Sequence, residues 1–132
     1  MKLNKFEPFL LAGLFFLLCT FYAGAQNITG AWLTENGLGK VEIYELKGEF
    51  WGKLIWVKEQ TEQAQKVVGT MVLKNLVRQK DGTYKGTVFD PETNKNYKAT
   101  VRLKNENKIE LYASLGFSLF GKTIYWERIT AD

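Results

Sequence analysis

Residues 96–104, with the sequence NYKATVRLK, contain the stretch that decides the fold. One set of alternate positions holds Tyr97, Ala99, Val101 and Leu103. The intervening positions hold Lys98, Thr100, Arg102 and Lys104. Because successive side chains of a strand point to opposite faces, this alternation predicts an antiparallel strand with one face in a core and the other in water.

Comparable stretches of β-branched and aromatic residues lie on both sides of this strand, and Gly, Asn and Asp turns separate them. A spacing of roughly 8–12 residues between short strands is typical of an all-β sandwich or barrel. The further strands are predicted at residues 28–34, 40–47, 50–57, 69–77, 83–89, 108–113 and 122–129. Gly52 inside the third strand predicts a bulge or sharp bend.

Eight consecutive strands joined by short connections form a meander, and closing the sheet removes its exposed edges. We therefore favour a closed, eight-stranded antiparallel up-and-down β-barrel over a sandwich. An interior of this size is either filled by side chains or holds one small ligand. The polar residues 58–66 predict an excursion with a helical turn, and residues 115–121 predict a buried loop or a short bent strand.

The N-terminus has the pattern of a secretory signal peptide. Lys2 and Lys5 precede an apolar run over residues 9–22, and the small residues Ala23, Gly24 and Ala25 follow it. The run is shorter than the ~20 residues that a transmembrane helix needs. We expect cleavage of residues 1–25, export to the periplasm or beyond, and one mature domain at 26–132 without a transmembrane segment; lipid attachment at Cys19 is the less favoured alternative.

Composition excludes several kinds of activity. The 132 residues include no His and one Cys, so a His-dependent catalytic dyad is ruled out and the main ligands of zinc are missing. The net charge of +4 is small and evenly spread, which does not indicate nucleic-acid binding. The acidic and amide residues at 90–96 indicate a turn around Pro91 rather than a calcium loop. We expect no enzyme, catalytic residue, metal or cofactor.

The two ends of the barrel sequence resemble those of the lipocalin-like (calycin) barrels. The resemblance rests on Gly30 and Trp32 in the first strand and on Trp126 and Arg128 in the last. It implies that these four residues close one end of the barrel, with the Arg packed across the Trp. A guanidinium over an indole ring also gains a cation–π contact.

The chain resembles, more closely, a bacterial family of unknown function made of small exported lipocalin-like barrels. Its pattern matches Gly39-x-Val41-x-Ile43-Tyr44, Gly52-Lys53-x-Ile55-Trp56, Phe89-Asp90-Pro91-x-x-x-Lys95-x-Tyr97 and Gly116-x-x-x-x-Gly121-x-Thr123-x-x-Trp126-x-Arg128. In that family a loop that contains Asp and Asn-Pro often follows the Gly-Lys strand, whereas this chain has the Gln- and Glu-rich residues 58–66 there. The resemblance implies a fold and an export route but no activity.

Two functions remain open. In the first, the barrel binds a small hydrophobic or amphipathic molecule, and its cavity wall includes Tyr97 and Ala99, with Tyr44 and Trp56 as the next candidates. In the second, the barrel is filled and acts as an interaction or structural module of the cell envelope, through an apolar patch at residues 115–120 and an undetermined protein partner.

Overall fold

A computed structural model describes residues 27–114 and 121–130. The described elements are β1 (Gly30–Leu33), the 3-10 helix η2 (Glu35–Gly37), β2 (Gly39–Leu46), β3 (Glu49–Val57), α2 (Glu62–Gln65), β4 (Met71–Arg78), β5 (Tyr84–Asp90), β6 (Lys95–Asn105), β7 (Lys108–Ser114) and β8 (Gly121–Arg128). All eight predicted strands are present, and no strand end differs from the predicted one by more than two residues. The helical turn predicted within residues 58–66 is α2.

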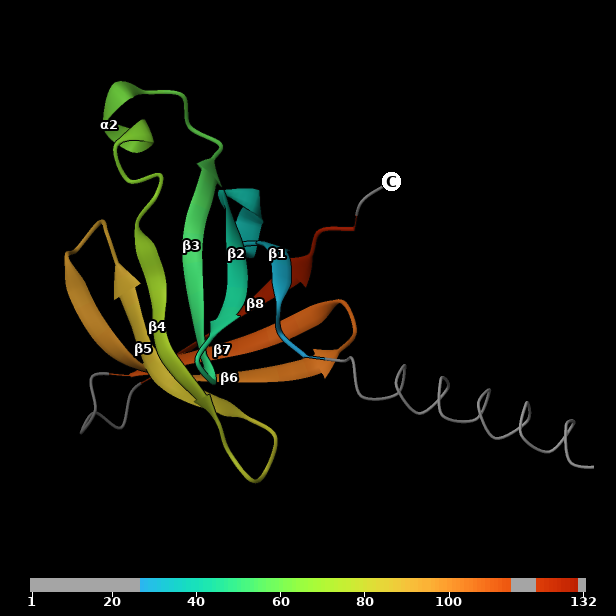
Figure 1. Ribbon diagram of the computed structural model, residues 1–132. Coiled ribbons are helices and arrows are strands. Elements are labelled where there is room, and N and C mark those ends of the chain that lie inside the picture. The colour runs from blue at the N-terminus through green and yellow to red at the C-terminus, as the bar shows by residue number, and fades with distance from the viewer. Residues whose placement is uncertain (1–26, 115–120, 131–132) are drawn as a thin grey trace, which may run out of the picture.

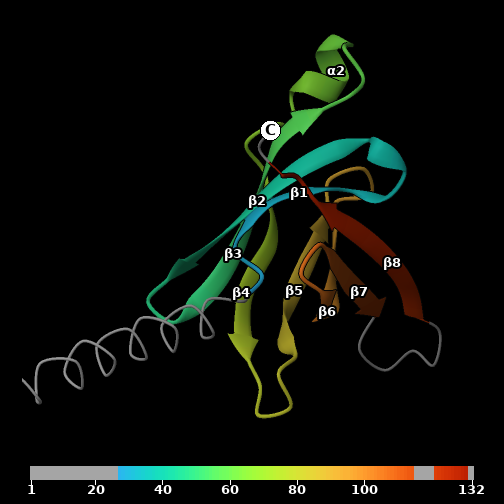
Figure 2. The ribbon, with the colours of Figure 1, turned by 90° about the vertical axis from the view of Figure 1, so that its right-hand side faces the viewer.

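The strands form one closed barrel in chain order, and each strand is antiparallel to its neighbours (Figures 1 and 2). The barrel closes where β1 meets β8, through the pairs Trp32↔Arg128 and Leu33↔Glu127. The predicted closed, eight-stranded barrel is therefore confirmed, and the sandwich is excluded.

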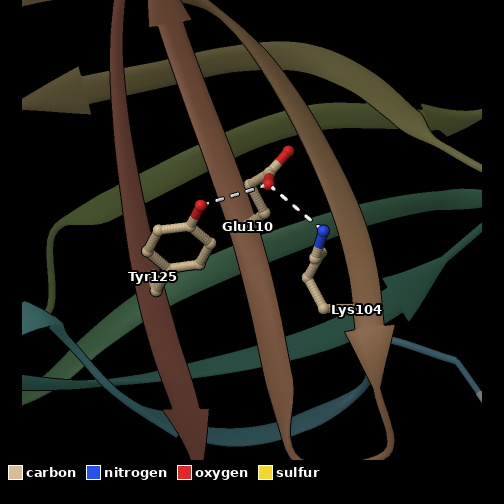
Figure 3. A network of polar contacts seen from close by, with 3 residues as sticks. All are labelled: Lys104, Glu110 and Tyr125. Atoms are coloured by element: carbon tan, nitrogen blue, oxygen red, sulfur yellow. Dashed lines mark hydrogen bonds and ion pairs between the residues drawn. The ribbon is translucent and has the colours of Figure 1, made fainter.

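The predicted alternation along β6 is also confirmed. Ala99 and Val101 are 3% and 0% exposed, whereas Lys98 and Arg102 are exposed on the outer face. On the same outer face, the Glu110 carboxylate of β7 accepts a hydrogen bond from the Tyr125 hydroxyl of β8 at 3.4 Å (Figure 3). It also lies 3.7 Å from the Lys104 ammonium. Exposed pairs of this kind contribute little to stability, so the fold depends on the interior.

The bend predicted at Gly52 is confirmed by the pairing of β3 with β4, whose register shifts on both sides of this residue. A Cβ atom at Gly52 would lie 3.0 Å from the Leu73 side chain. The missing side chain thus lets the two strands bend around a buried Leu, as a small barrel requires.

The two ends of the barrel differ. The β4–β5 turn lies at one end, and α2 lies at the other (Figure 1). The half of the barrel nearest the β4–β5 turn is packed with buried side chains, which include Ile28, Trp32, Ile43, Phe50, Leu76, Tyr84, Val101 and Ile109. Phe50 and Tyr84 meet edge to face there, with ring centroids 5.0 Å apart. This end is closed by a solid core.

Two sequence predictions fall on other parts of the chain. The signal peptide predicted at residues 1–25 lies outside the described residues, and so does the loop or bent strand predicted at residues 115–121 except for Gly121, which begins β8. Within the described residues, no helix has the length and apolar character needed to cross a membrane.

Candidate functional site

The closed end is centred on Trp32 and Arg128, which are paired across the β1–β8 seam. The Arg128 guanidinium carbon lies 4.4 Å from the centroid of the Trp32 ring, which confirms the predicted contact. The indole is fully buried, and its Nε1–H donates a hydrogen bond of 2.9 Å to the Ile28 carbonyl. This hydrogen bond holds residues 27–29, which precede β1, against the closed end of the barrel.

Arg128 also binds three backbone carbonyls. Its Nε donates to Glu106 at 2.7 Å, Nη1 donates to Thr29 at 2.6 Å, and Nη2 donates to Asn27 at 2.9 Å. A Cβ atom on Gly30 would lie 2.8 Å from Nη1, and the φ of Gly30 is +125°. The Gly30 position therefore needs a residue without a side chain, and the guanidinium joins the N-terminal segment to the β6–β7 turn.

The opposite half of the barrel holds a cavity of about 1040 Å³ that opens to solvent at the end near α2. Small-molecule sites typically have volumes of roughly 300–1000 Å³. The wall inside the barrel is apolar for most of its area, and it is formed by Val41, Leu54, Val57, Val72, Val88, Tyr97, Leu111, Ala113, Ile124 and Trp126. Trp126 is 5% exposed and pairs with the buried Ile109, so its ring lies between the cavity and the packed core.

The loops at the open end form the cavity mouth. Leu38, which follows η2, lines the mouth and is 61% exposed. Thr61, Ala64 and Val67 of the β3–β4 connection also line it. This connection is fixed at its base, because Gly69 N–H donates to the Leu54 carbonyl at 2.7 Å. The polar segment 58–66 thus contributes to the entrance of the cavity.

Tyr97 and Ala99 both lie on the inward face of β6, as predicted. Tyr97 lines the cavity and pairs with the inward Val88 of β5. Ala99 lies two residues closer to the packed core, between Gly86 and Ala113 in the register of the sheet. It is buried but is not among the residues that line the cavity.

Tyr44 and Trp56 lie on the outer surface, so the prediction that they line the cavity is wrong. Tyr44 pairs with Trp51, and its hydroxyl lies 3.7 Å from the sulfur of Met71. The Trp56 ring lies under the Lys40 ammonium, which is 4.6 Å from its centroid.

A shift in strand register explains the position of Trp56. The pairing of β2 with β3 is irregular between Lys40 and Val41, so that Lys40 pairs with Trp56 while Val41 pairs with Leu54. Val41 and Leu54 face inward. The extra residue, Ile55, shifts the alternation of β3, and Trp56 therefore shares the outward face with Lys40.

Several wall residues were absent from the sequence prediction, and Lys122 is the most informative of them. It lies on β8 opposite Ala113 and lines the cavity together with Ile124 and Trp126. Alternation within KTIYWER places these residues on one face, but a Lys at the start of a strand is usually taken to point into water. The partner of Lys122 on β7 is Ala113, which lines the cavity. This pairing is the additional signal that assigns Lys122 to the cavity side of β8.

The turn after β5 borders the mouth through Asp90, Pro91 and Glu92. The Asp90 carboxylate accepts the Glu92 backbone N–H at 2.9 Å, and its carbonyl accepts the Asn94 N–H at 2.8 Å. The predicted turn is therefore confirmed. Within residues 27–114 and 121–130, no three His, Cys, Asp or Glu side chains are grouped as metal ligands would be.

A closed, eight-stranded antiparallel barrel with one plugged end and one open end is the lipocalin-like fold. Residues 30–128 match the family described as "uncharacterized protein conserved in bacteria" (DUF2147), and the chain belongs to this family.

A solved structure supports the same fold. A protein of the human pathogen Helicobacter pylori, described as a member of the lipocalin family, superimposes with a TM-score of 0.64 at 20% sequence identity. The match covers 79% of this chain and 84% of the other. None of the curated proteins matches this chain significantly in sequence.

Proposed function

We propose that this protein is an exported binding module that holds one small hydrophobic or amphipathic molecule in its open cavity. The cavity carries the proposal. A cavity of about 1040 Å³ occupies the half of the barrel near α2, whereas buried side chains fill the other half. An apolar wall that stays accessible to water gains free energy when an apolar ligand displaces that water.

The arrangement of the entrance supports this function. Leu38 exposes an apolar side chain at the mouth, and Val67 extends the apolar surface onto the β3–β4 connection. The Tyr97 hydroxyl adds a polar group on the inner wall, which suits a molecule with one polar end. The filled-barrel alternative has no comparable support, because a filled barrel would not keep such an opening.

Export belongs to the same proposal. The predicted signal peptide at residues 1–25 would bring the barrel across the cytoplasmic membrane. The mature chain has no Cys, because its single Cys lies within that peptide. Its stability must then come from the core and the closed hydrogen-bond ladder rather than from disulfides.

Binding of the neutral fluorophore N-phenyl-1-naphthylamine tests the proposal. We expect its emission to rise on titration with the wild-type protein, and Tyr97→Ala to change its affinity. Ala113→Phe, which fills the inner wall, should weaken binding at least about tenfold, whereas Tyr44→Ala and Trp56→Ala on the outer surface should leave it unchanged. Thermal unfolding checks that each variant is folded. Equal binding by a folded Ala113→Phe variant would show that the probe does not occupy the cavity.

A further inference from the structure

The β8 strand presents a Lys at the mouth of the cavity. Lys122 pairs with Ala113, and the next inward pairs towards the closed end are Ile124↔Leu111 and Trp126↔Ile109. Lys122, Ile124 and Trp126 all line the cavity. Lys122 therefore lies on the same face of β8 as the apolar wall residues, one step nearer the mouth than Ile124, where its side chain is exposed to solvent.

The charged groups around the cavity are not equivalent. Lys122 is the one basic residue among the described residues that line it, and it belongs to a strand. Glu59, Asp90 and Glu92 also line the cavity, but they lie at the mouth in or beside its loops. The Asp90 carboxylate already accepts a backbone hydrogen bond from Glu92.

Lys122 lacks a carboxylate partner within the described part of the chain. The ion pair found there joins Lys104 to Glu110 on the outer face of the barrel, and none involves Lys122. Lys122 is exposed at the mouth, so water moderates its attraction to an anion, and burial of an apolar tail against the adjacent wall supplies the rest of the binding free energy. The wall thus offers a positive charge that a ligand can neutralise.

We infer that the ligand is a long-chain monocarboxylate whose head group pairs with Lys122 and whose tail lies against Ile124, Leu111 and Trp126. This inference rests on the proposed binding function. Tyr97 of β6 lies further towards the mouth in the sheet register and also lines the cavity, so its side chain adds a phenol group to the wall around the head group. A singly charged head fits best, because the carboxylates of Glu59, Asp90 and Glu92 would repel a dianionic phosphate.

Competition between two matched ligands tests the inference. Dodecanoate and dodecan-1-ol have the same chain and differ in the charge of the head, and each can displace N-phenyl-1-naphthylamine at mildly alkaline pH. We expect the wild-type protein to prefer dodecanoate about tenfold, the magnitude of one charge-assisted hydrogen bond. Lys122→Gln should abolish this preference, and Lys98→Gln on the outward face of β6 should retain it.

The outcomes separate the two proposals. If both ligands displace the probe equally well from the wild-type protein, or if a folded Lys122→Gln variant keeps the preference, the assignment of Lys122 is overturned while cavity binding stands. If the probe and both ligands fail to bind the folded wild-type protein, the proposed function itself fails, and this inference with it.

Discussion

Arg128 lies across the Trp32 ring at 4.4 Å and holds three carbonyls from two separate segments, so one side chain joins the first strand, the last strand and the β6–β7 turn. The contact is at the closed end, and neither Trp32 nor Arg128 is among the described residues that line the cavity. Stability and ligand binding therefore depend on different ends of the barrel, and variants at the two ends should have separable effects.

Trp32→Ala should lower the free energy of unfolding by about 3–5 kcal/mol, because it removes a fully buried indole and leaves a cavity. Arg128→Lys should cost about 1–2 kcal/mol, since Lys lacks the planar fork that bonds three carbonyls. Urea unfolding measures both values. Arg102→Lys on the exposed face of β6 is the control and should cost less than about 0.5 kcal/mol. A loss below about 1 kcal/mol for Trp32→Ala would contradict its role in closing the barrel.

Gly86→Ala should destabilise the barrel by about 1–3 kcal/mol, because a Cβ atom there would lie 2.6 Å from the Lys74 carbonyl oxygen and 2.7 Å from that of Asn75. These oxygens belong to the irregular part of β4, where Asn75 has a φ of 52°. Backbone atoms cannot move aside as a flexible side chain can. Lys85→Ala, at the adjacent outward position, is the matched control for urea unfolding. Equal stability of the two variants would refute this close approach of β4 and β5.

Asp81 should titrate below its ordinary pKa near 3.8. The Thr83 hydroxyl donates to its carboxylate at 2.6 Å and is the main cause of the lowered pKa; the Thr83 backbone N–H, at 3.0 Å, is the second. Because the pKa is lower in the folded state, the stabilisation is complete above the unfolded-state pKa and is lost as pH falls through the folded-state pKa.

NMR titration of the Asp81 carboxyl carbon measures this pKa directly. Thr83→Val should raise it towards the ordinary value and reduce the loss of stability in acid, as measured by urea unfolding at several pH values. A wild-type Asp81 that titrates at or above 3.8 would contradict the hydrogen-bonded geometry of the β4–β5 turn.

Export should remove residues 1–25. Mass spectrometry of protein recovered from the producing cell should find an N-terminus at Gln26, either free or cyclised. An intact Met1 in a membrane fraction would instead indicate an uncleaved anchor, and a lipid-modified Cys19 would indicate a lipoprotein. Either result would refute cleavage after Ala25.

The sequence predicts strand orientation well where one face is polar. The alternation on β6 places Tyr97 and Ala99 inward correctly, because Lys98, Thr100 and Arg102 mark the opposite face. On β2, Lys40 and Glu42 likewise mark the outward face that Tyr44 shares. The alternation of charged residues was thus a better guide there than aromatic character.

Trp56 and Lys122 show what local sequence does not reveal. The position of Trp56 depends on an extra residue in the β2–β3 pairing, which is a property of two strands together. Lys122 lies on the same face of β8 as the buried Trp126, and its partner on β7 is the cavity-lining Ala113, so it lines the cavity even though it is exposed at the mouth. Packing of the whole strand therefore decides where one charged residue points.

Native mass spectrometry of the protein recovered from its own producing cells, compared with Ala113→Phe prepared in the same way, tests the cavity-binding claim most directly. We predict that the wild-type protein carries an additional small-molecule mass, which is released on gentle activation, and that the folded Ala113→Phe variant carries none. If the wild-type protein shows only the mass of its polypeptide, or if the blocked variant carries the same additional mass, the cavity does not hold a ligand and the claim is contradicted.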